Sequence, residues 1–401
     1  MRLVVPAERR PGERRVAAVP DTVAALVRAG HQVVVESGAG TASFVFDDDY
    51  RDVGAEVSAD DVLPGADVVL HVRPLLPDAA SRLRPGAITI GFCSPSSEPD
   101  GVRALRDARV TAFAMELVPR ISRAQSMDAL TSQALVAGYR CVLEAAMRLP
   151  RFYPLFMTAA GTVPPARVLV LGAGVAGLQA IATARRLGAV VEAYDVRPAS
   201  ADEVRSMGAT FITLELEAIE GTGGYAREMA EDRARRQMEL LAPYVVKSDV
   251  VITTAAVPGR RAPLLMTRSM VEGMRPGSVV VDLAAESGGN VEGSVAGQSI
   301  QVGGAVLVGM ADASSAMPVD ASRLYAKNLT NLLELMVDAE GELALDLDDD
   351  VLAGACLTHD GVVRHAATAE LLGDAPTPPA DEPPPGAGPA AATAADDEGD
   401  A

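Results

Sequence analysis

The chain has 401 residues, of which 49% are hydrophobic and 22% charged, so general disorder is excluded and two domains are expected. A formal net charge of −19 gives a surface that repels phosphate backbones, which counts against nucleic-acid binding. Lysine is rare, since Lys247 and Lys327 are the two lysines among 35 basic residues, and there are four histidines. Few side chains are therefore available for proton transfer.

The cysteines and the N-terminus indicate a cytoplasmic protein. Cys93, Cys141 and Cys356 are far apart and show neither metal-ligand spacing nor a disulfide framework, which fits a reducing cytosol. The first residues reach the charged Glu8 too soon for a signal peptide, and no run of residues reads as a membrane span. We therefore expect no metal site and no direct membrane insertion.

Short runs rich in Val, Leu and Ile alternate with helical stretches along the chain. The runs do not alternate polar with apolar residues, as expected of strands buried on both faces of a parallel sheet. In chain order they are Arg2–Val5, Gln32–Glu36, Asp67–Val72, Ala87–Phe92, Val168–Leu171, Val190–Tyr194, Asp249–Thr253 and Ser278–Leu283. Helices are predicted at Pro20–Ala29, Gly101–Ala108 and Gly177–Leu187. The sequence thus predicts an α/β protein with two Rossmann-like, doubly wound parallel-sheet domains.

Two long helical stretches are expected to join these domains. Residues 126–149 contain no helix breaker except Gly138, and residues 321–337 form a second stretch that returns the chain. The expected units are an N-terminal α/β domain at 1–125 completed by 320–373, a dinucleotide-binding Rossmann domain at 126–319, and a tail at 374–401. The tail holds seven prolines, seven acidic residues and no basic residue, so we expect it to be disordered.

A glycine motif follows directly after the strand that ends at Leu171. Gly172 permits a tight turn, Gly174 lets the backbone approach a pyrophosphate, and Gly177 lets the following helix pack on the strand. The N-terminus of that helix offers free N–H groups and partial positive charge to phosphates. The predicted phosphate-binding set is Gly172, Ala173, Gly174, Val175, Ala176 and Gly177.

The next strand runs into Asp195, 21 residues after Gly174. A carboxylate there accepts hydrogen bonds from ribose hydroxyls and repels a 2′-phosphate, which favours NAD over NADP. Arg197 gives a mixed signal, because an arginine nearby can accommodate a 2′-phosphate. Two later strands end in loops of small residues, one of which contains Ala255. Such loops at the carboxyl ends of parallel strands can bind a ligand, or they can be ordinary tight turns.

Groups suited to proton transfer are scarce near these strand ends. His71, at the end of Asp67–Val72, is the one histidine placed where a ligand could reach it, although a partly buried strand histidine is an equally simple interpretation. The residues suit a reaction that needs only two rings placed face to face, such as hydride transfer between nicotinamides.

Three segments carry a more specific pattern: Arg120–Gln133, the stretch from Gly172 to Ala184, and Tyr194–Pro198. They resemble the NAD(H)-binding component of proton-translocating NAD(P) transhydrogenase, a family related to alanine dehydrogenase. The resemblance covers roughly residues 1–340, and Arg120–Gln133 is its most specific segment. It implies direct hydride transfer from NADH to NADP(H) on a separate component, coupled to proton movement by a membrane component.

The resemblance also implies roles for individual residues. The catalytic candidates are Arg120, Gln125 and Asp128, which with Thr131 would surround the nicotinamide, and Gln125 would help to place the two rings. The residues implied to hold the adenosine are Asp195, Val196 and Arg197, with Arg197 over the adenine. Gly224 and Tyr225 would belong to a mobile loop that closes over NAD.

Each of these residues also has an ordinary structural interpretation. Asp128 lies in the first turn of a predicted helix, where any carboxylate gains from the helix dipole. Arg120 could be a surface ion-pair partner, and Tyr225 an ordinary loop aromatic. The family usually has Ser where Thr131 stands, and because the hydroxyl is retained we expect its contact to be retained.

The resemblance further implies a homodimer, cytoplasmic and attached to the membrane face through a membrane-spanning subunit and an NADP(H)-binding subunit. Two alternatives remain open: an alanine-dehydrogenase-like enzyme that uses His71, and a non-catalytic NAD-binding module. His71 stands where both related families commonly have Lys, no second histidine lies near Gly91, and Glu286 stands where alanine dehydrogenases have a catalytic Asp. These differences count against amino-acid oxidation.

Overall fold

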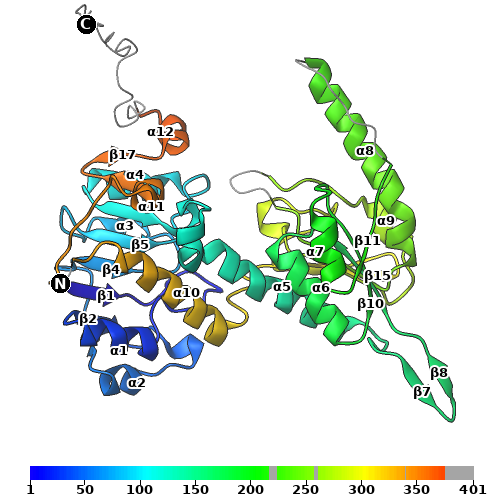
Figure 1. The fold of residues 1–401 in the computed structure, drawn as a ribbon, viewed down its shortest axis with the longest axis horizontal. Helices are drawn as coiled ribbons and strands as arrows, with labels where there is room; N and C mark the ends of the chain where they lie inside the picture. The colour runs from blue at the N-terminus through cyan, green and yellow to red at the C-terminus, as the bar shows by residue number, and fades with distance from the viewer. Residues whose placement is uncertain (216–223, 257–260, 339, 375–401) are drawn as a thin grey trace, which may run out of the picture.

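The computed structural model describes residues 1–215, 224–256, 261–338 and 340–374, and for 224–231 the backbone alone. Two bodies, each built on a largely parallel β-sheet with helices on both faces, lie side by side and are joined by the long helix α5 (Ala129–Arg148) (Figure 1). The predicted α/β fold class with two doubly wound sheets is confirmed.

The first sheet has the strand order β17-β16-β6-β5-β4-β1-β2-β3. Its strands are β1 (Arg2–Val5), β2 (Gln32–Glu36), β3 (Glu56–Ser58), β4 (Val68–Leu70), β5 (Ile88–Gly91), β6 (Thr111–Ala114), β16 (Cys356–His359) and β17 (Val362–Val363). β1 to β6 are parallel, whereas β16 and β17 add an antiparallel edge. The chain therefore returns to the first sheet after it has built the second.

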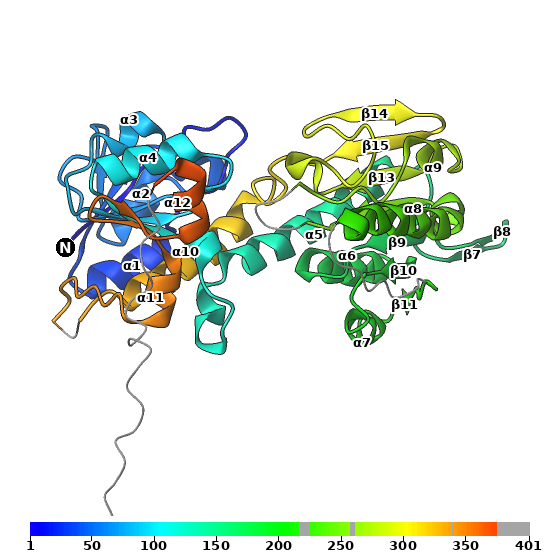
Figure 2. The ribbon, with the colours of Figure 1, turned by 90° about the horizontal axis from the view of Figure 1, so that it is seen from above.

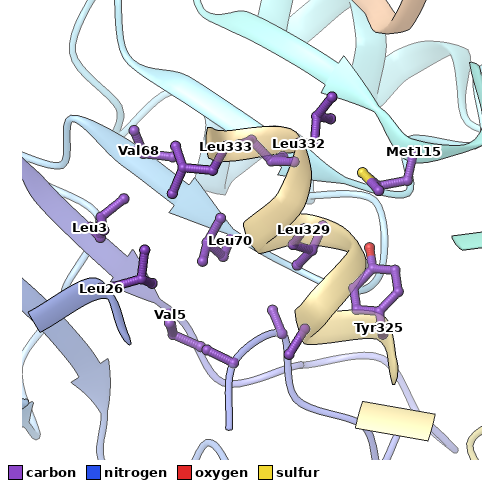
Figure 3. Packing of buried hydrophobic residues seen from close by; sticks show 14 of the residues in the cluster. Leu3, Val5, Leu26, Val68, Leu70, Met115, Tyr325, Leu329, Leu332 and Leu333 are labelled. Carbon is purple, nitrogen blue, oxygen red and sulfur yellow. The ribbon is translucent and has the colours of Figure 1, made fainter. Parts of the chain in front are cut away.

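Helices bury both faces of the first sheet. One face carries α1 (Pro20–Arg28), α2 (Asp47–Asp52), α10 (Pro318–Glu334) and α11 (Asp350–Ala355), and the other carries α3 (Pro77–Ala80), α4 (Pro99–Asp107) and α12 (Ala366–Leu372). Tyr325 and Leu329 of α10 are fully buried above Leu3 and Leu70 of the sheet (Figure 3). This packing fixes α10 against the first body.

The second sheet has the order β11-β10-β9-β12-β13-β15-β14, in which only the edge strand β14 is antiparallel. Its strands are β9 (Arg167–Leu171), β10 (Val190–Tyr194), β11 (Thr210–Phe211), β12 (Val250–Thr253), β13 (Val279–Asp282), β14 (Ser299–Val302) and β15 (Ala305–Gly309). Helix α6 (Val175–Arg186), the end of α5 and α7 (Ser200–Ser206) cover one face, and α8 (Gly224–Lys247) and α9 (Arg268–Glu272) cover the other (Figure 2). The strand order reverses between β9 and β12, which is where open α/β sheets bind their ligands.

Helix α5 belongs to the hydrophobic cores of both bodies. Ala129 at its start is buried in the first body, whereas Cys141 and Ala145 are buried in the second. A 3₁₀ helix, η3 (Ser122–Met127), precedes α5. The sequence predicted one uninterrupted helix from residue 126, but Asp128 ends η3 and caps α5 by accepting a hydrogen bond from the Thr131 N–H.

Two peripheral features complete the fold. A hairpin of β7 (Phe156–Thr158) and β8 (Gly161–Val163) projects from the second body (Figure 1). Asp374, the first residue of the predicted tail, accepts hydrogen bonds from Arg106 at 2.6 Å, and the rest of the tail lies outside the described residues. Within the described ranges, no helix combines the length and apolar character that crossing a membrane requires.

Candidate functional site

The glycine turn lies at the point where the order of the second sheet reverses. Gly172 has a φ of 104°, a conformation that L side chains rarely adopt, and a Cβ added there would lie 2.7 Å from the Thr254 hydroxyl. A Cβ on Gly177 would lie 1.9 Å from the Gly172 carbonyl oxygen. Because neither position has room for a side chain, these two glycines close the turn between β9 and α6.

Gly174 differs from its two neighbours in the motif. A Cβ on it would meet no atom within 4 Å, and it is the N-cap residue of α6. Val175, Ala176 and Gly177 form the first turn of α6, where the N–H groups have no partner inside the helix. Open space beside free N–H groups and the positive end of a helix dipole suits a phosphate.

Gly138 of α5 holds the start of α6 in place. A Cβ on Gly138 would lie 2.1 Å from the carbonyl oxygen of Ala176, so the two helices touch through their backbones here. In the sequence Gly138 looked only like a weak point in a long helix. Its position instead explains why a glycine occurs in the middle of α5.

Asp195 follows β10 and lies beside the glycine turn. Its carboxylate accepts a hydrogen bond from the Ala173 N–H at 2.7 Å and from the Arg197 N–H at 2.8 Å, and it pairs with the Arg197 Nε at 3.0 Å. Burial raises the pKa of Asp195, but the hydrogen bonds from Arg197 and Ala173 outweigh burial and hold this pKa below its ordinary value. The carboxylate is therefore ionised at neutral pH, and Val196 beside it is exposed.

Arg197 lies on Asp195 in this structure rather than extending over the place expected for an adenine. Its guanidinium binds both carboxylate oxygens, at 3.0 and 3.1 Å, while most of the side chain stays exposed. A ribose that binds Asp195 must therefore share this carboxylate with Arg197 or displace it.

The predicted nicotinamide-side residues gather at the junction of η3 and α5. The structure brings Asp128 and Thr131 together, because Asp128 accepts hydrogen bonds from the Thr131 N–H at 2.8 Å and the Thr131 hydroxyl at 2.6 Å. Asp128 therefore acts as a helix cap, as its ordinary interpretation holds. Arg120 and Gln125 are exposed. Among the described residues neither side chain makes a hydrogen bond, so both are free to meet a ligand.

Asn290, which the sequence analysis did not single out, shapes the loop that carries Ala255. Its amide accepts a hydrogen bond from the Ala255 N–H at 3.1 Å and donates to the Ala255 carbonyl at 2.8 Å. The buried Asp282 carboxylate accepts from the Asn290 N–H at 3.0 Å and the Thr253 hydroxyl at 2.9 Å. The available signal was a polar Asp282 ending an otherwise apolar strand.

The predicted closing loop cannot be placed. Helix α8 begins at Gly224, and residues 216–223 and the side chain of Tyr225 lie outside the described residues.

His71 is buried, with 1% of its surface exposed, so the expectation that a ligand could reach it is wrong and the strand-histidine interpretation holds. Its Nδ1 lies 2.7 Å from the Arg73 carbonyl oxygen, and the Tyr325 hydroxyl donates to the His71 carbonyl at 3.0 Å. Burial lowers the pKa of His71 to about 4. The ring is therefore neutral and shielded from solvent at physiological pH.

A charged network lies near His71 and connects the two bodies. Glu13 is fully buried and pairs with Arg15 at 2.7 Å and with Arg73 at 2.9 Å. Arg15 also donates to the side-chain oxygen of Gln133 in α5 at 2.9 Å, and Arg73 pairs with Asp312 of the second body. Each of these cations is thus already neutralised by a carboxylate of the chain.

Glu8 provides a prediction that depends on pH. Burial, with a smaller contribution from Glu13, raises the pKa of Glu8 from 4.5 to about 7, although its carboxylate accepts a hydrogen bond from the Val72 N–H at 2.6 Å. Because the folded-state pKa is raised, the unfolded chain releases this proton at a lower pH than the folded chain. The resulting stability is complete below pH 4.5 and is lost as pH rises through 7, by up to about 2 kcal/mol between pH 5 and pH 8.

We expect this loss to disappear in Glu8→Gln. Urea unfolding of both proteins at pH 5 and pH 8 gives the difference between their pH dependences, which cancels the other titrating groups. Equal pH dependence of the two proteins would contradict a raised pKa for Glu8.

Comparison with known proteins gives two family matches that together cover most of the chain. Residues 4–137 match the alanine dehydrogenase/PNT N-terminal domain, and residues 141–366 match the alanine dehydrogenase/PNT C-terminal domain. The two matches meet within α5, the helix that joins the two bodies.

Individual relatives fall into two groups. An NAD(P) transhydrogenase alpha subunit from Rhodospirillum rubrum is 47% identical over 378 residues, covering 92% of this chain and 98% of that protein. An alanine dehydrogenase from Mycolicibacterium smegmatis is 31% identical over 377 residues, covering 92% of this chain and 96% of that protein. A crystal structure of a transhydrogenase from Sinorhizobium meliloti superposes with a TM-score of 0.83 at 46% identity, covering 90% of this chain and 100% of that one.

Proposed function

The chain belongs to the alanine dehydrogenase/PNT family, and on that premise we propose that its glycine turn and the η3–α5 junction hold NAD(H) for direct hydride transfer to NADP(H) on a partner subunit. Relatives at 40–47% identity are named subunits of NAD(P) transhydrogenase. The chain is accordingly the NAD(H)-binding component of such an enzyme.

The phosphate end of NAD(H) is assigned to the turn formed by the six residues from Gly172 to Gly177. Gly174 leaves open space where a pyrophosphate can approach the backbone, and the first turn of α6 supplies N–H groups. Ala255, fixed by Asn290, borders the same turn through its neighbour Thr254, whose hydroxyl donates to the Gly172 carbonyl at 3.1 Å. These features support a site that fits a dinucleotide without rearrangement of the β9–α6 turn.

The nicotinamide end is assigned to Arg120, Gln125, Asp128 and Thr131. Bound NADH supplies the hydride, and the residues around it supply position. Asp128 and Thr131 hold each other, while Gln125 and Arg120 present free side chains. We assign Gln125 the task of orienting the nicotinamide amide group, and with it the ring, toward the partner's nucleotide.

The burial of His71 is the observation that favours hydride transfer without a proton over amino-acid oxidation. An amino-acid dehydrogenase needs a group that takes a proton from its substrate, and His71, the residue suggested for that task, is 1% exposed with a pKa near 4. Arg15 and Arg73, which could have met a substrate carboxylate, are paired with Glu13. Transfer between two nicotinamides requires neither group.

The partners are inferred at two levels. The relatives' names imply further subunits, and we propose an NADP(H)-binding subunit and a membrane-spanning subunit that couples the reaction to proton translocation, with this chain peripheral on the cytoplasmic face. We also propose a homodimer. The β7–β8 hairpin supports it, because Phe156 and Met157 on it and Phe152 and Leu155 before it are 42–75% exposed apolar side chains. Sedimentation at micromolar concentration tests the dimer.

One assay tests the proposed function. The purified chain is mixed with the NADP(H)-binding component, and cyclic hydride exchange is followed between NADH, NADP and an acetyl-pyridine analogue of NAD. Exchange that requires both proteins supports the proposal. Alanine-dependent NAD reduction without exchange would favour an amino-acid dehydrogenase, and tight NADH binding without either activity would favour a non-catalytic binding module.

Asp195→Ala should weaken NADH binding by about 1–3 kcal/mol, the usual value of a hydrogen bond to a charged group. The variant also releases Arg197, so Arg197→Ala serves as a control that frees the carboxylate while keeping it. Calorimetric titration with NADH compares the three proteins. Unchanged affinity in Asp195→Ala would remove this residue from the site.

A further inference from the structure

Two asparagines of α10 bind one backbone carbonyl of η3. The side-chain amide of Asn328 donates to the Ser126 carbonyl at 2.8 Å, and that of Asn331 donates to the same oxygen at 2.9 Å. A carbonyl oxygen has two lone pairs, so these two donors satisfy it completely. Ser126 follows Gln125 directly, and its carbonyl therefore sets the orientation of the turn that presents Gln125.

Asn328 additionally connects η3 with the first turn of α5. Its side-chain oxygen accepts a hydrogen bond from the Ser132 hydroxyl at 2.7 Å, and Asn328 is 7% exposed. Ser132 lies one residue after Thr131, in the turn capped by Asp128. One buried amide thus contacts both backbone segments that carry the proposed nicotinamide residues.

The helix that carries Asn328 is a firm base. Tyr325, Leu329 and Leu332 of α10 are fully buried in the core of the first body (Figure 3). From the other side, Ala124 and Met127 anchor η3 in that same core. Because backbone and core fix both partners, the amide can hold Ser126 to within tenths of an ångström, the precision that hydride transfer requires.

We propose that Asn328 is a positioning residue, which sets Gln125 and the Asp128–Thr131 cap relative to each other for hydride transfer. This inference rests on the proposed function. Asn328 contacts neither nucleotide itself and acts through the Ser126 carbonyl and the Ser132 hydroxyl.

Asn328→Asp removes the donor to Ser126 while keeping an acceptor for Ser132, and Asn328→Ser is a second variant that is small enough to fold if the carboxylate is not tolerated. Glu334→Gln, an exposed change at the other end of α10, is the matched control. We expect the Asn328 variants to lose about tenfold or more in the maximal rate of hydride exchange, with NADH affinity within about twofold of wild type.

Amide hydrogen exchange provides a readout that does not depend on activity. The Asp128 N–H donates to the Gln125 carbonyl and the Thr131 N–H to the Asp128 carboxylate, so both should exchange faster in the Asn328 variants and unchanged in Glu334→Gln. An equal loss of rate and affinity, or unchanged exchange at Asp128 and Thr131, would overturn the inference. A wild-type chain without hydride exchange would overturn the proposed function instead, and amide exchange would still decide whether Asn328 holds the two turns.

Discussion

Gly177→Ala is expected to abolish measurable NADH binding and to lower the free energy of unfolding by about 3 kcal/mol, at the upper end of the usual cost of overpacking. The added Cβ would lie 1.9 Å from the carbonyl oxygen of Gly172, and a backbone atom cannot move aside as a flexible side chain can. Relief requires α6 to move away from β9, which opens the turn and displaces the N–H groups assigned to the pyrophosphate. Urea unfolding and calorimetric titration with NADH measure the two effects.

Gly174→Ala is the matched control, because it places the same methyl group at another glycine of the turn, in open space. We expect stability within about 1 kcal/mol of wild type, the range of an N-cap change, and NADH affinity reduced about tenfold where the methyl obstructs the pyrophosphate. If Gly174→Ala bound NADH as tightly as wild type, the open space beside it would not be the phosphate site.

Gln125→Asn is expected to slow hydride exchange about 10- to 100-fold while NADH affinity changes by less than about threefold. The substitution shortens the side chain by one methylene and so withdraws the amide by about 1.5 Å. A displacement of that size is large compared with the precision that ring-to-ring transfer requires, but the binding of the rest of the dinucleotide does not depend on it.

Single-turnover rates with the NADP(H)-binding component, together with NADH titration, separate these two quantities for Gln125→Asn. Ser122→Ala, an exposed change in the same 3₁₀ helix, should leave both unchanged. A variant that lost affinity and rate in proportion would show that Gln125 contributes binding and not ring placement.

The buried strands were the most predictable elements of the molecule. β1, β2 and β10 have the predicted bounds, and the other predicted strands differ by one or two residues at an end. Continuous runs of Val, Leu and Ile identify strands covered on both faces. The β7–β8 hairpin and the edge strands β14 and β17 lack that pattern because one or both of their faces meet solvent, and the sequence analysis did not predict them.

The candidate site was predictable where local backbone geometry determines the residue type. Gly172 and Gly177 are glycines because no side chain fits, and this requirement is visible in the spacing of the motif. Contacts between distant segments were not visible. His71 looked accessible from its place at a strand end, yet Tyr325, some 250 positions later, covers it. Asn290 and Asn328 were missed for the same reason, since their partners come from other segments of the chain.

The sharing of α5 between two hydrophobic cores restricts how the molecule can bend. A helix of 20 residues whose first turn is sealed into one body and whose second half is sealed into the other behaves as a strut clamped at both ends. The two bodies cannot swing apart about a flexible joint at this connection without breaking a core. Any opening for nucleotide entry must therefore come from twisting about the strut or from local yielding at Asp128, where its helical hydrogen bonding begins.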